Sequence, residues 1–326
     1  ESCNCQCTTT LLLSSPVHTP VHYLYSSREQ KLSVTEDNTK YMPLTTHLFN
    51  KTRLQAASQD GAVVPLTLLH MPALSELHKA PLLLHVYGAY GVDLNMAFSP
   101  EKRLLLEDGW ALAYCHVRGG SKRGLAWHRV GSVLQKWRGV EDHAACIQTL
   151  HHLGVSHPAL TALTARSAGA VLAGALCNHN PQLLRAVILQ APFLDVLGTM
   201  QDPSPPLTVE EGGEWGDPRI REHMDNIASY CPCHNIIPQL YPSVLITAYS
   251  EDCRVPLSGV MKYVERLNKA IQMYTVPLGL VLTVSVYIVT IFPLFPGHVL
   301  FLDLKKCLQP GFLNRPKCRG FGFCFL

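Results

Sequence analysis

Residues 160–178 read LTALTARSAGAVLAGALCN, and this stretch decides the fold class. The apolar run from Leu160 to Ala165 predicts a short strand, and the small residues from Ala168 to Asn178 predict a helix. Ser167 stands at the turn between them, flanked at two residues' distance by Ala165 and Gly169. A serine on such a turn exposes its hydroxyl above a sheet, and the next backbone N–H can face a reacting oxyanion. The alternative is a serine that only caps the helix.

The sequence on both sides predicts alternating strands and helices. Strands are expected at 53–57, 63–70, 81–87, 110–117, 184–190 and 243–249, and helices at 103–108, 139–154 and 258–270. Asp60-Gly61 predicts a hairpin turn between the first two strands. The continuous apolar strands are typical of a parallel sheet that helices cover on both faces.

Composition excludes several classes of protein. The chain has 326 residues, of which 47% are hydrophobic and 16% charged, so it can bury a sizeable core. The net charge of +3 is too small for a strongly basic nucleic-acid-binding protein. No Gly-rich phosphate loop with Lys-Ser/Thr is present. We therefore expect neither a nucleic-acid partner nor a cofactor.

The 12 cysteines do not form a disulfide scaffold pattern. Cys115, Cys146 and Cys177 stand singly among apolar residues, which favours buried free thiols in a reducing compartment. Cys231 and Cys233 flank Pro232 without a CxxC spacing, so the sequence predicts no metal site. Residues 1–10 lack the pattern of a signal peptide.

An acidic residue follows a later strand. Residues 241–252 form an apolar strand that ends in Glu251-Asp252, at the edge where parallel sheets place catalytic groups. In serine hydrolases of this kind the acid follows the serine along the chain, and a histidine base comes last. Asp252 is therefore a candidate acid, and the alternative is a turn residue that caps the next helix. Arg254 can pair with Asp252 or contact a substrate carbonyl.

Seven short motifs in order resemble the catalytic domain of the prolyl oligopeptidase family of serine hydrolases. They are YGAYG at 87–91, HVRGG at 116–120, GLAWH at 124–128, SAG at 167–169, APF at 191–193, EWGDP at 214–218 and DCRVP at 252–256. The resemblance runs from about Thr52 to Ile271. It implies an α/β-hydrolase fold, with the family's β-propeller essentially missing here.

The resemblance also implies roles for individual residues. Ser167 matches the nucleophile, Asp252 the triad acid and Arg254 the arginine that holds a substrate carbonyl. The oxyanion hole would combine the Ala168 N–H with a donor from the loop that carries Tyr87 and Tyr90, and the sequence leaves open which tyrosine faces the site. Ala165, Ala170 and Ser121-Lys122 depart from the family pattern. These departures cast doubt on efficient endopeptidase action, and one branch of the family is associated with esterase or thioesterase activity.

The sequence suggests three segments. Residues 1–50 are a poorly defined N-terminal remnant, which can hold at most the last strands of the propeller, and a strand is expected near Val21 to Tyr25. Residues 51–271 form the catalytic domain. Residues 272–326 form a divergent, apolar C-terminal segment. Residues 270–302 contain no Asp, Glu, Lys or Arg, and Pro and Gly interrupt this apolar run. Three interpretations of this C-terminal segment remain open. It is a sequence unrelated to the family, or a divergent last strand followed by the loop that carries the base histidine, or a membrane anchor over 276–302.

His298 bears on this choice, because it lies 46 residues after Asp252 and directly follows a glycine. It is the candidate triad base, and the alternative is coincidence. We therefore expect a cytoplasmic serine hydrolase that cleaves short peptides, acyl esters or thioesters with Ser167, Asp252 and His298. The alternative is a catalytically impaired interaction module, or a membrane-associated fragment tethered through the apolar C-terminus.

Overall fold

The structure, a computed structural model, describes residues 8–13, 15–16, 20–34, 49–202, 211–252, 254–275 and 286–291. Its main sheet has eight strands in the order β11-β10-β9-β8-β6-β7-β5-β4. The strands are β4 (Asn50–Ala57), β5 (Val63–His70), β6 (Leu82–Val86), β7 (Ala111–Cys115), β8 (Thr161–Arg166), β9 (Ala186–Gln190), β10 (Ser243–Tyr249) and β11 (Val286–Ile291). From β7 to β11 the neighbours are parallel, and β5 is antiparallel to both β4 and β7. This confirms the predicted α/β-hydrolase fold.

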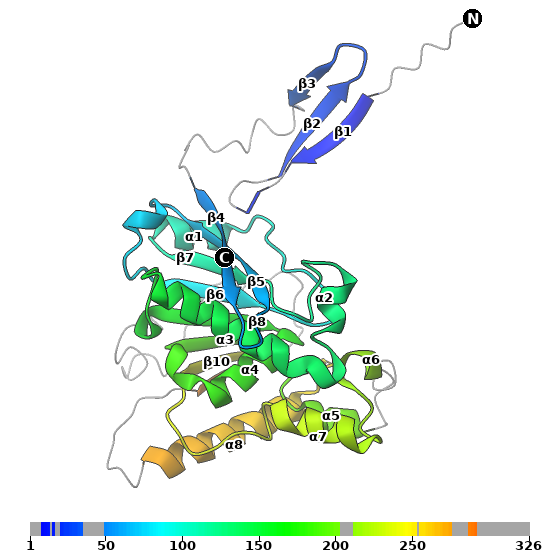
Figure 1. Ribbon diagram of the computed structural model, residues 1–326, viewed down its shortest axis with the longest axis vertical. Coiled ribbons are helices and arrows are strands. Elements are labelled where there is room, and N and C mark those ends of the chain that lie inside the picture. Colours follow the sequence, from blue (N-terminus) through cyan, green and yellow to red (C-terminus); the bar gives the residue numbers. More distant parts are fainter. Residues whose placement is uncertain are drawn as a thin grey trace, which may run out of the picture.

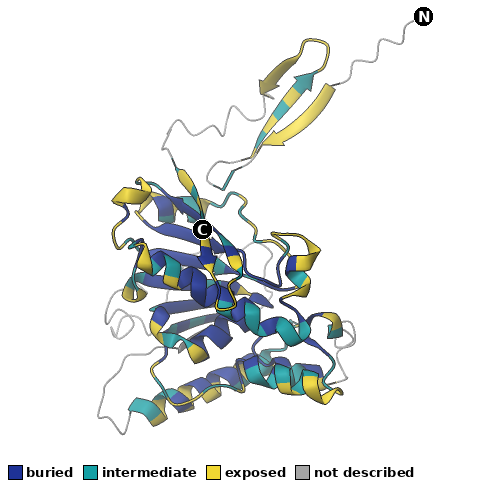
Figure 2. Ribbon diagram, in the orientation of Figure 1, coloured by how far each residue is buried: buried dark blue, intermediate teal, exposed yellow. Residues whose placement is uncertain are grey.

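A second, three-stranded antiparallel sheet lies near the N-terminus. It consists of β1 (Thr8–Leu13), β2 (Val21–Ser26) and β3 (Lys31–Val34). The strand expected near Val21 is therefore present. Figure 2 shows that this small sheet is mostly exposed, whereas the main sheet is mostly buried.

Helices cover the main sheet (Figure 1). They are α1 (Pro100–Glu107), α2 (Leu125–Arg129), α3 (Lys136–His152), α4 (Gly169–His179), α5 (Val196–Gln201), α6 (Gly212–Trp215), α7 (Arg221–Tyr230) and α8 (Leu257–Thr275), with short 3-10 turns at Leu74–Glu76, Val133–Gln135, Pro158–Leu160 and Pro181–Leu183. The small residues of α4 let it pack on β6, β8 and β9, while α3 packs against α4. α1 contacts β7, and α8 contacts β10.

Alternation along the strands divides the core between the two faces of the sheet. Leu82, Leu84 and Val86 join the larger apolar cluster with α3, α4 and α8, whereas Leu83 joins a smaller cluster with Leu106 of α1. Successive side chains of a strand point to opposite faces, which explains the division. The continuous apolar runs in the sequence therefore reflect burial on both faces.

The parallel strands bring the candidate residues to one edge. β6 ends at Val86, β8 at Arg166 and β10 at Tyr249, so that Tyr87, Ser167 and Asp252 each follow a strand end. The carboxyl ends of neighbouring parallel strands share an edge, and that edge is where open α/β sheets build their sites.

Part of the apolar C-terminal run belongs to the main sheet. β11 lies inside this run and pairs with β10 from Val244 opposite Val286 to Tyr249 opposite Ile291. The other residues of 276–302 lie outside the described part of the chain. Among the described residues, no helix combines the length and hydrophobicity needed to cross a bilayer.

Candidate active site

Ser167 occupies a strained turn between β8 and α4. Its φ of +49° lies in the left-handed region, which side-chain-bearing residues rarely adopt. The Ser167 N–H donates to the Gln190 carbonyl at 2.9 Å, and the Ser167 carbonyl accepts from the Phe193 N–H at 3.1 Å. These bonds to the segment after β9 hold the turn in place. Strain that the surrounding structure fixes in this way is typical of functional residues.

The side chain of Ser167 is available for chemistry. α4 has no side-chain cap at its N-terminus, so Ser167 does not cap the helix. The Ser167 side chain is half-buried, and its hydroxyl has no hydrogen-bond partner among the described residues. The backbone N–H of Ala168 likewise has no acceptor within the described part of the chain. A free hydroxyl beside a free N–H is the arrangement that acyl transfer requires.

Gly169 permits the close approach of the neighbouring strand end. A Cβ atom at Gly169 would lie 2.9 Å from the Val86 carbonyl oxygen and 3.0 Å from the Tyr87 Cα. Such contacts are shorter than ordinary van der Waals separations. The glycine therefore sets Tyr87 directly against the turn that carries Ser167.

The two loop tyrosines have different surroundings. Tyr87 touches the Gly169 position, and its electrostatic neighbours include Arg254. Burial raises the pKa of Tyr87, so its phenol keeps its proton at neutral pH and can donate a hydrogen bond. The Tyr90 hydroxyl instead donates to Glu211 and accepts from Trp215 Nε1 at 3.0 Å. Within the described structure, the Tyr87 hydroxyl therefore has no hydrogen-bond partner, whereas the Tyr90 hydroxyl has two.

A buried ion pair holds the loop between these tyrosines. Lys136 Nζ bonds to Glu214 Oε1 and donates to the Gly88 carbonyl at 3.1 Å. Glu214 Oε2 accepts from the Tyr90 N–H at 2.9 Å and lies 2.8 Å from His128 Nε2. The side chains of Lys136 and Glu214 are 1% and 3% exposed. Two loop backbone groups thus depend on one charge pair.

Asp252 organises the turn after β10. Its Oδ1 accepts from the backbone N–H groups of Arg254 and Val255, both at 2.9 Å. Among the described residues no ion pair joins Asp252 to Arg254, whose side chain is exposed. Asp252 therefore has a turn-forming role, and its Oδ2 has no hydrogen-bond partner in the described part of the chain.

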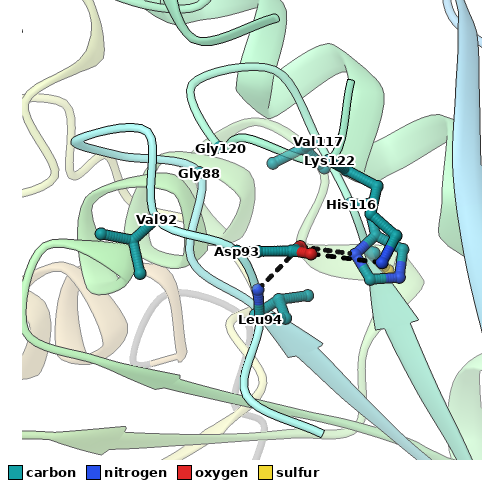
Figure 3. A pocket seen from close by; sticks show the side chains of 9 residues that line it. Gly88, Val92, Asp93, Leu94, His116, Val117, Gly120 and Lys122 are labelled. Atoms are coloured by element: carbon teal, nitrogen blue, oxygen red, sulfur yellow. Dashed lines mark hydrogen bonds and ion pairs between the residues drawn. The ribbon is translucent and has the colours of Figure 1, made fainter. Parts of the chain in front are cut away.

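The candidate base, His298, lies outside the described residues, so the structure does not place it. A histidine near the loop, His116, is already engaged on both nitrogens. Its Nδ1 lies 3.1 Å from Asp93 Oδ1 and its Nε2 lies 3.0 Å from Thr67 Oγ1, while Lys122 contacts the other Asp93 oxygen (Figure 3). The pocket beside it has a volume of about 10 Å³, enough for about one water molecule. His116 is therefore a structural residue.

Sequence analysis missed the contribution of Lys136. At the start of a helix, a lysine in the segment Lys136-Trp-Arg138 resembles a surface residue. Its partner Glu214 lies 78 positions away in the EWGDP motif. The motif marked Glu214 as notable, but nothing local in the sequence pairs it with Lys136.

Comparison with known proteins identifies related sequences and structures. Residues 96–277 match the sequence profile described as the prolyl oligopeptidase family. The chain is 54% identical over 259 residues to a Gallus gallus protein named "Prolyl endopeptidase-like", covering 79% of this chain and 35% of that protein. The Homo sapiens protein of the same name is 54% identical over 260 residues, with the same coverage. The chain spans about a third of the length of these relatives.

Solved structures show the same similarity. Oligopeptidase B from Leishmania major superposes with a TM-score of 0.76 at 27% identity, covering 87% of this chain and 38% of that one. Oligopeptidase B from Trypanosoma brucei with covalently bound antipain gives a TM-score of 0.74 at 28% identity, covering 90% of this chain and 42% of that one.

Proposed function

This chain belongs to the prolyl oligopeptidase family of serine peptidases, and on that premise we propose that it is a serine hydrolase with Ser167 as the nucleophile. The observation that carries the proposal is the turn at Ser167. There a serine at φ +49° presents an unbonded hydroxyl next to the unbonded N–H of Ala168.

The proposed first step is attack of the Ser167 oxygen on a substrate carbonyl. The serine proton passes to His298, the proposed base, and Asp252 orients the imidazole through its free Oδ2. The negative charge on the former carbonyl oxygen is stabilised by the Ala168 N–H and the Tyr87 hydroxyl. Tyr87 is preferred to Tyr90 because the Tyr90 hydroxyl is occupied by Glu211 and Trp215.

The proposed second step is release of the leaving group and hydrolysis of the acyl-enzyme. His298 donates its proton to the leaving group, and a water molecule then attacks the ester with His298 again as the base. The bond between the acyl carbon and the Ser167 oxygen then breaks, and His298 returns the proton to Ser167. Arg254 is proposed to bind another carbonyl of the substrate, since its exposed guanidinium is an electrostatic neighbour of Tyr87. Short peptides and acyl esters or thioesters are the proposed substrates, and the cytoplasm is the proposed location.

Labelling with a fluorophosphonate probe tests this proposal. We expect the wild type to label, Ser167→Ala to lose all labelling, and Asp252→Asn and His298→Ala to label more slowly by roughly 10³-fold or more. Ser258→Ala and His152→Ala alter exposed residues outside the proposed triad and serve as matched controls.

Two results would count against the proposal. One is a folded wild type that does not label, and the other is equal labelling of Ser167→Ala and Ser258→Ala. The ratio of kcat/KM for a peptide anilide and for a thioester with the same acyl part then assigns the substrate class.

A further inference from the structure

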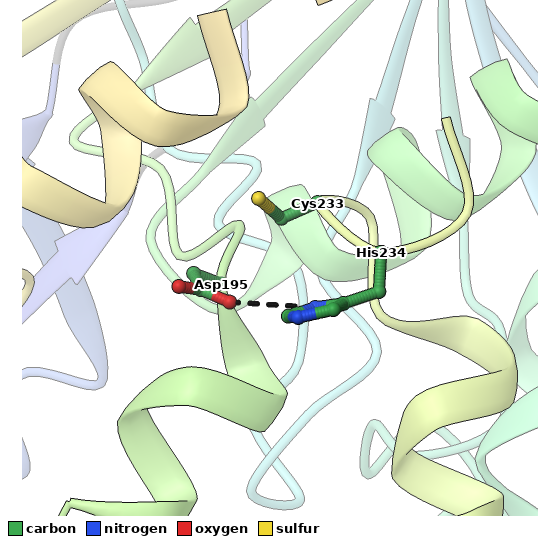
Figure 4. Close-up of side chains that lie close together, drawn as sticks. All are labelled: Asp195, Cys233 and His234. Atoms are coloured by element: carbon green, nitrogen blue, oxygen red, sulfur yellow. Dashed lines mark ion pairs between the residues drawn. The ribbon is translucent and has the colours of Figure 1, made fainter. Parts of the chain in front are cut away.

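A group of metal-ligating side chains lies away from Ser167, where the segment after β9 meets the loop after α7. Asp195, Cys233 and His234 each offer one donor atom, and the three atoms lie within 4.8 Å of one another (Figure 4). Asp195 and Cys233 are buried, and His234 is exposed on one side. We propose that Asp195, Cys233 and His234 bind a divalent cation, with zinc the ion that best suits this mixture of oxygen, sulfur and nitrogen donors.

The distances support a shared ion. The Asp195 Oδ1 lies 3.5 Å from His234 Nδ1, and a second thiol, Cys231 Sγ, lies 3.2 Å from the same nitrogen. Around a tetrahedral zinc ion, two ligand atoms are separated by about 3.3 Å for nitrogen and oxygen and about 3.6 Å for nitrogen and sulfur. The separation of the Asp195 and His234 donor atoms therefore matches that of two co-ligands, and the Cys233 thiol lies within 4.8 Å of both.

Asp195 is held in place by its neighbours. Its Oδ1 accepts from the Gly198 N–H at 3.3 Å, and its Oδ2 accepts from Lys262 Nζ at 2.7 Å. A ligating carboxylate is usually fixed by an outer hydrogen-bond donor, and Lys262 supplies this donor here. The remaining capacity of Oδ1 faces His234.

Binding of the ion would involve the Cys233 sulfur as a thiolate. Zinc binds the thiolate, and the thiol proton passes to solvent on binding. The charge of Asp195 and the thiolate together balance the charge of the ion.

The ion would connect three parts of the structure. Asp195 follows Phe193, whose N–H bonds to the Ser167 carbonyl, and Lys262 belongs to α8. Cys233 and His234 belong to the loop after α7. The proposed site would thus stabilise the segment on which the Ser167 turn rests, without contacting the reacting atoms.

Cobalt substitution tests the site independently of hydrolase activity. The metal-stripped full chain, kept in a non-thiol reductant, is titrated with Co²⁺ and the thiolate-to-cobalt charge-transfer and visible bands are recorded. We expect one ion per chain, and displacement of cobalt by Zn²⁺. His234→Gln changes an exposed side chain, so it should fold, and with Cys233→Ser it should abolish these bands. Lys262→Gln, which alters the outer partner, should weaken binding by about 10–100-fold.

The control addresses other thiols in the chain. Cys3, Cys5 and Cys7 lie outside the described residues, so a variant with all three changed to serine should retain the bands. The proposal is overturned if the folded chain binds no Co²⁺, in which case Asp195 only pairs with Lys262 and His234. It is also overturned if binding survives in both His234→Gln and Cys233→Ser.

Discussion

Replacement of Glu214 by glutamine should destabilise the protein strongly. The change keeps the shape of the side chain but leaves the Lys136 ammonium, 1% exposed, without its counter-charge. Removing one member of a buried ion pair costs about 3–5 kcal/mol of unfolding free energy. A typical domain has about 5–15 kcal/mol in total, so the loss would be a large share of the stability. The backbone groups of Gly88 and Tyr90, which the pair holds, should also lose order.

The pH dependence of this loss identifies its cause. Burial lowers the pKa of Lys136, and Glu214 opposes that effect, so Glu214→Gln should lower the pKa further. The unfolded chain then binds more protons than the folded chain below the ordinary lysine pKa, and stability rises with pH. We therefore expect the deficit of Glu214→Gln to be smaller at about pH 9 than at about pH 7.

Urea denaturation followed by tryptophan fluorescence measures both effects, because Trp215 is buried beside Lys136. Glu222→Gln, on the exposed face of α7, is the matched control and should change stability by less than about 0.5 kcal/mol. The double variant Lys136→Met/Glu214→Leu should recover part of the loss, since it removes the unpaired buried charge but leaves the Gly88 carbonyl and the Tyr90 N–H without their partners. A deficit for Glu214→Gln below about 1 kcal/mol, or one independent of pH, would refute the reasoning.

Three further changes have defined outcomes. Gly169→Ala should cost about 1–3 kcal/mol in urea denaturation and slow fluorophosphonate labelling, because its Cβ would press on Tyr87; unchanged labelling would contradict this. The hydrogen bond from Arg118 lowers the Asp60 pKa from 3.8 to about 2, so the contribution of Asp60 to stability is present above about pH 4 and is lost as the pH falls through 2. In an acid titration of stability, Asp60→Asn should lose less stability between about pH 4 and pH 2 than the wild type does. An acid transition identical to that of the wild type would contradict this expectation. Burial lowers the His85 pKa to about 3, so wild-type stability should fall as the pH drops below 6.5. His85→Phe, which preserves the stack on Tyr114, should show a smaller difference in denaturation midpoint between about pH 7 and pH 5, and an equal difference would count against it.

Local patterns in the sequence predicted much of the fold. The strand expected at 243–249 has those bounds, because Pro242 and the turn at Ser250 limit the apolar run. The helix expected at 258–270 extends to Thr275, since no glycine or proline stands between Ala270 and Pro277. The turn at Ser167 was also predictable, because its strand, small residues and helix are contiguous in the sequence.

Features that depend on distant residues were not predictable. β11 lies in a mostly apolar run in which periodicity does not distinguish a strand from a helix, so a last strand was only one of three alternatives from the sequence. The Lys136–Glu214 pair and the cluster of Asp195, Cys233 and His234 join segments far apart in the sequence. Their members have ordinary local contexts, so only the folded chain brings them together.

The turn after β10 also limits how this protein can be re-engineered. One oxygen of Asp252 accepts from the N–H groups of Arg254 and Val255. The orientation of the carboxylate and the position of Arg254 are therefore coupled, and one cannot change without the other. Lengthening the turn to move Arg254, the proposed substrate-binding residue, would rotate Asp252, the proposed acid, at the same time. A laboratory evolution programme would therefore find new substrate preference more readily by varying the side chain at Arg254 than by inserting residues beside it.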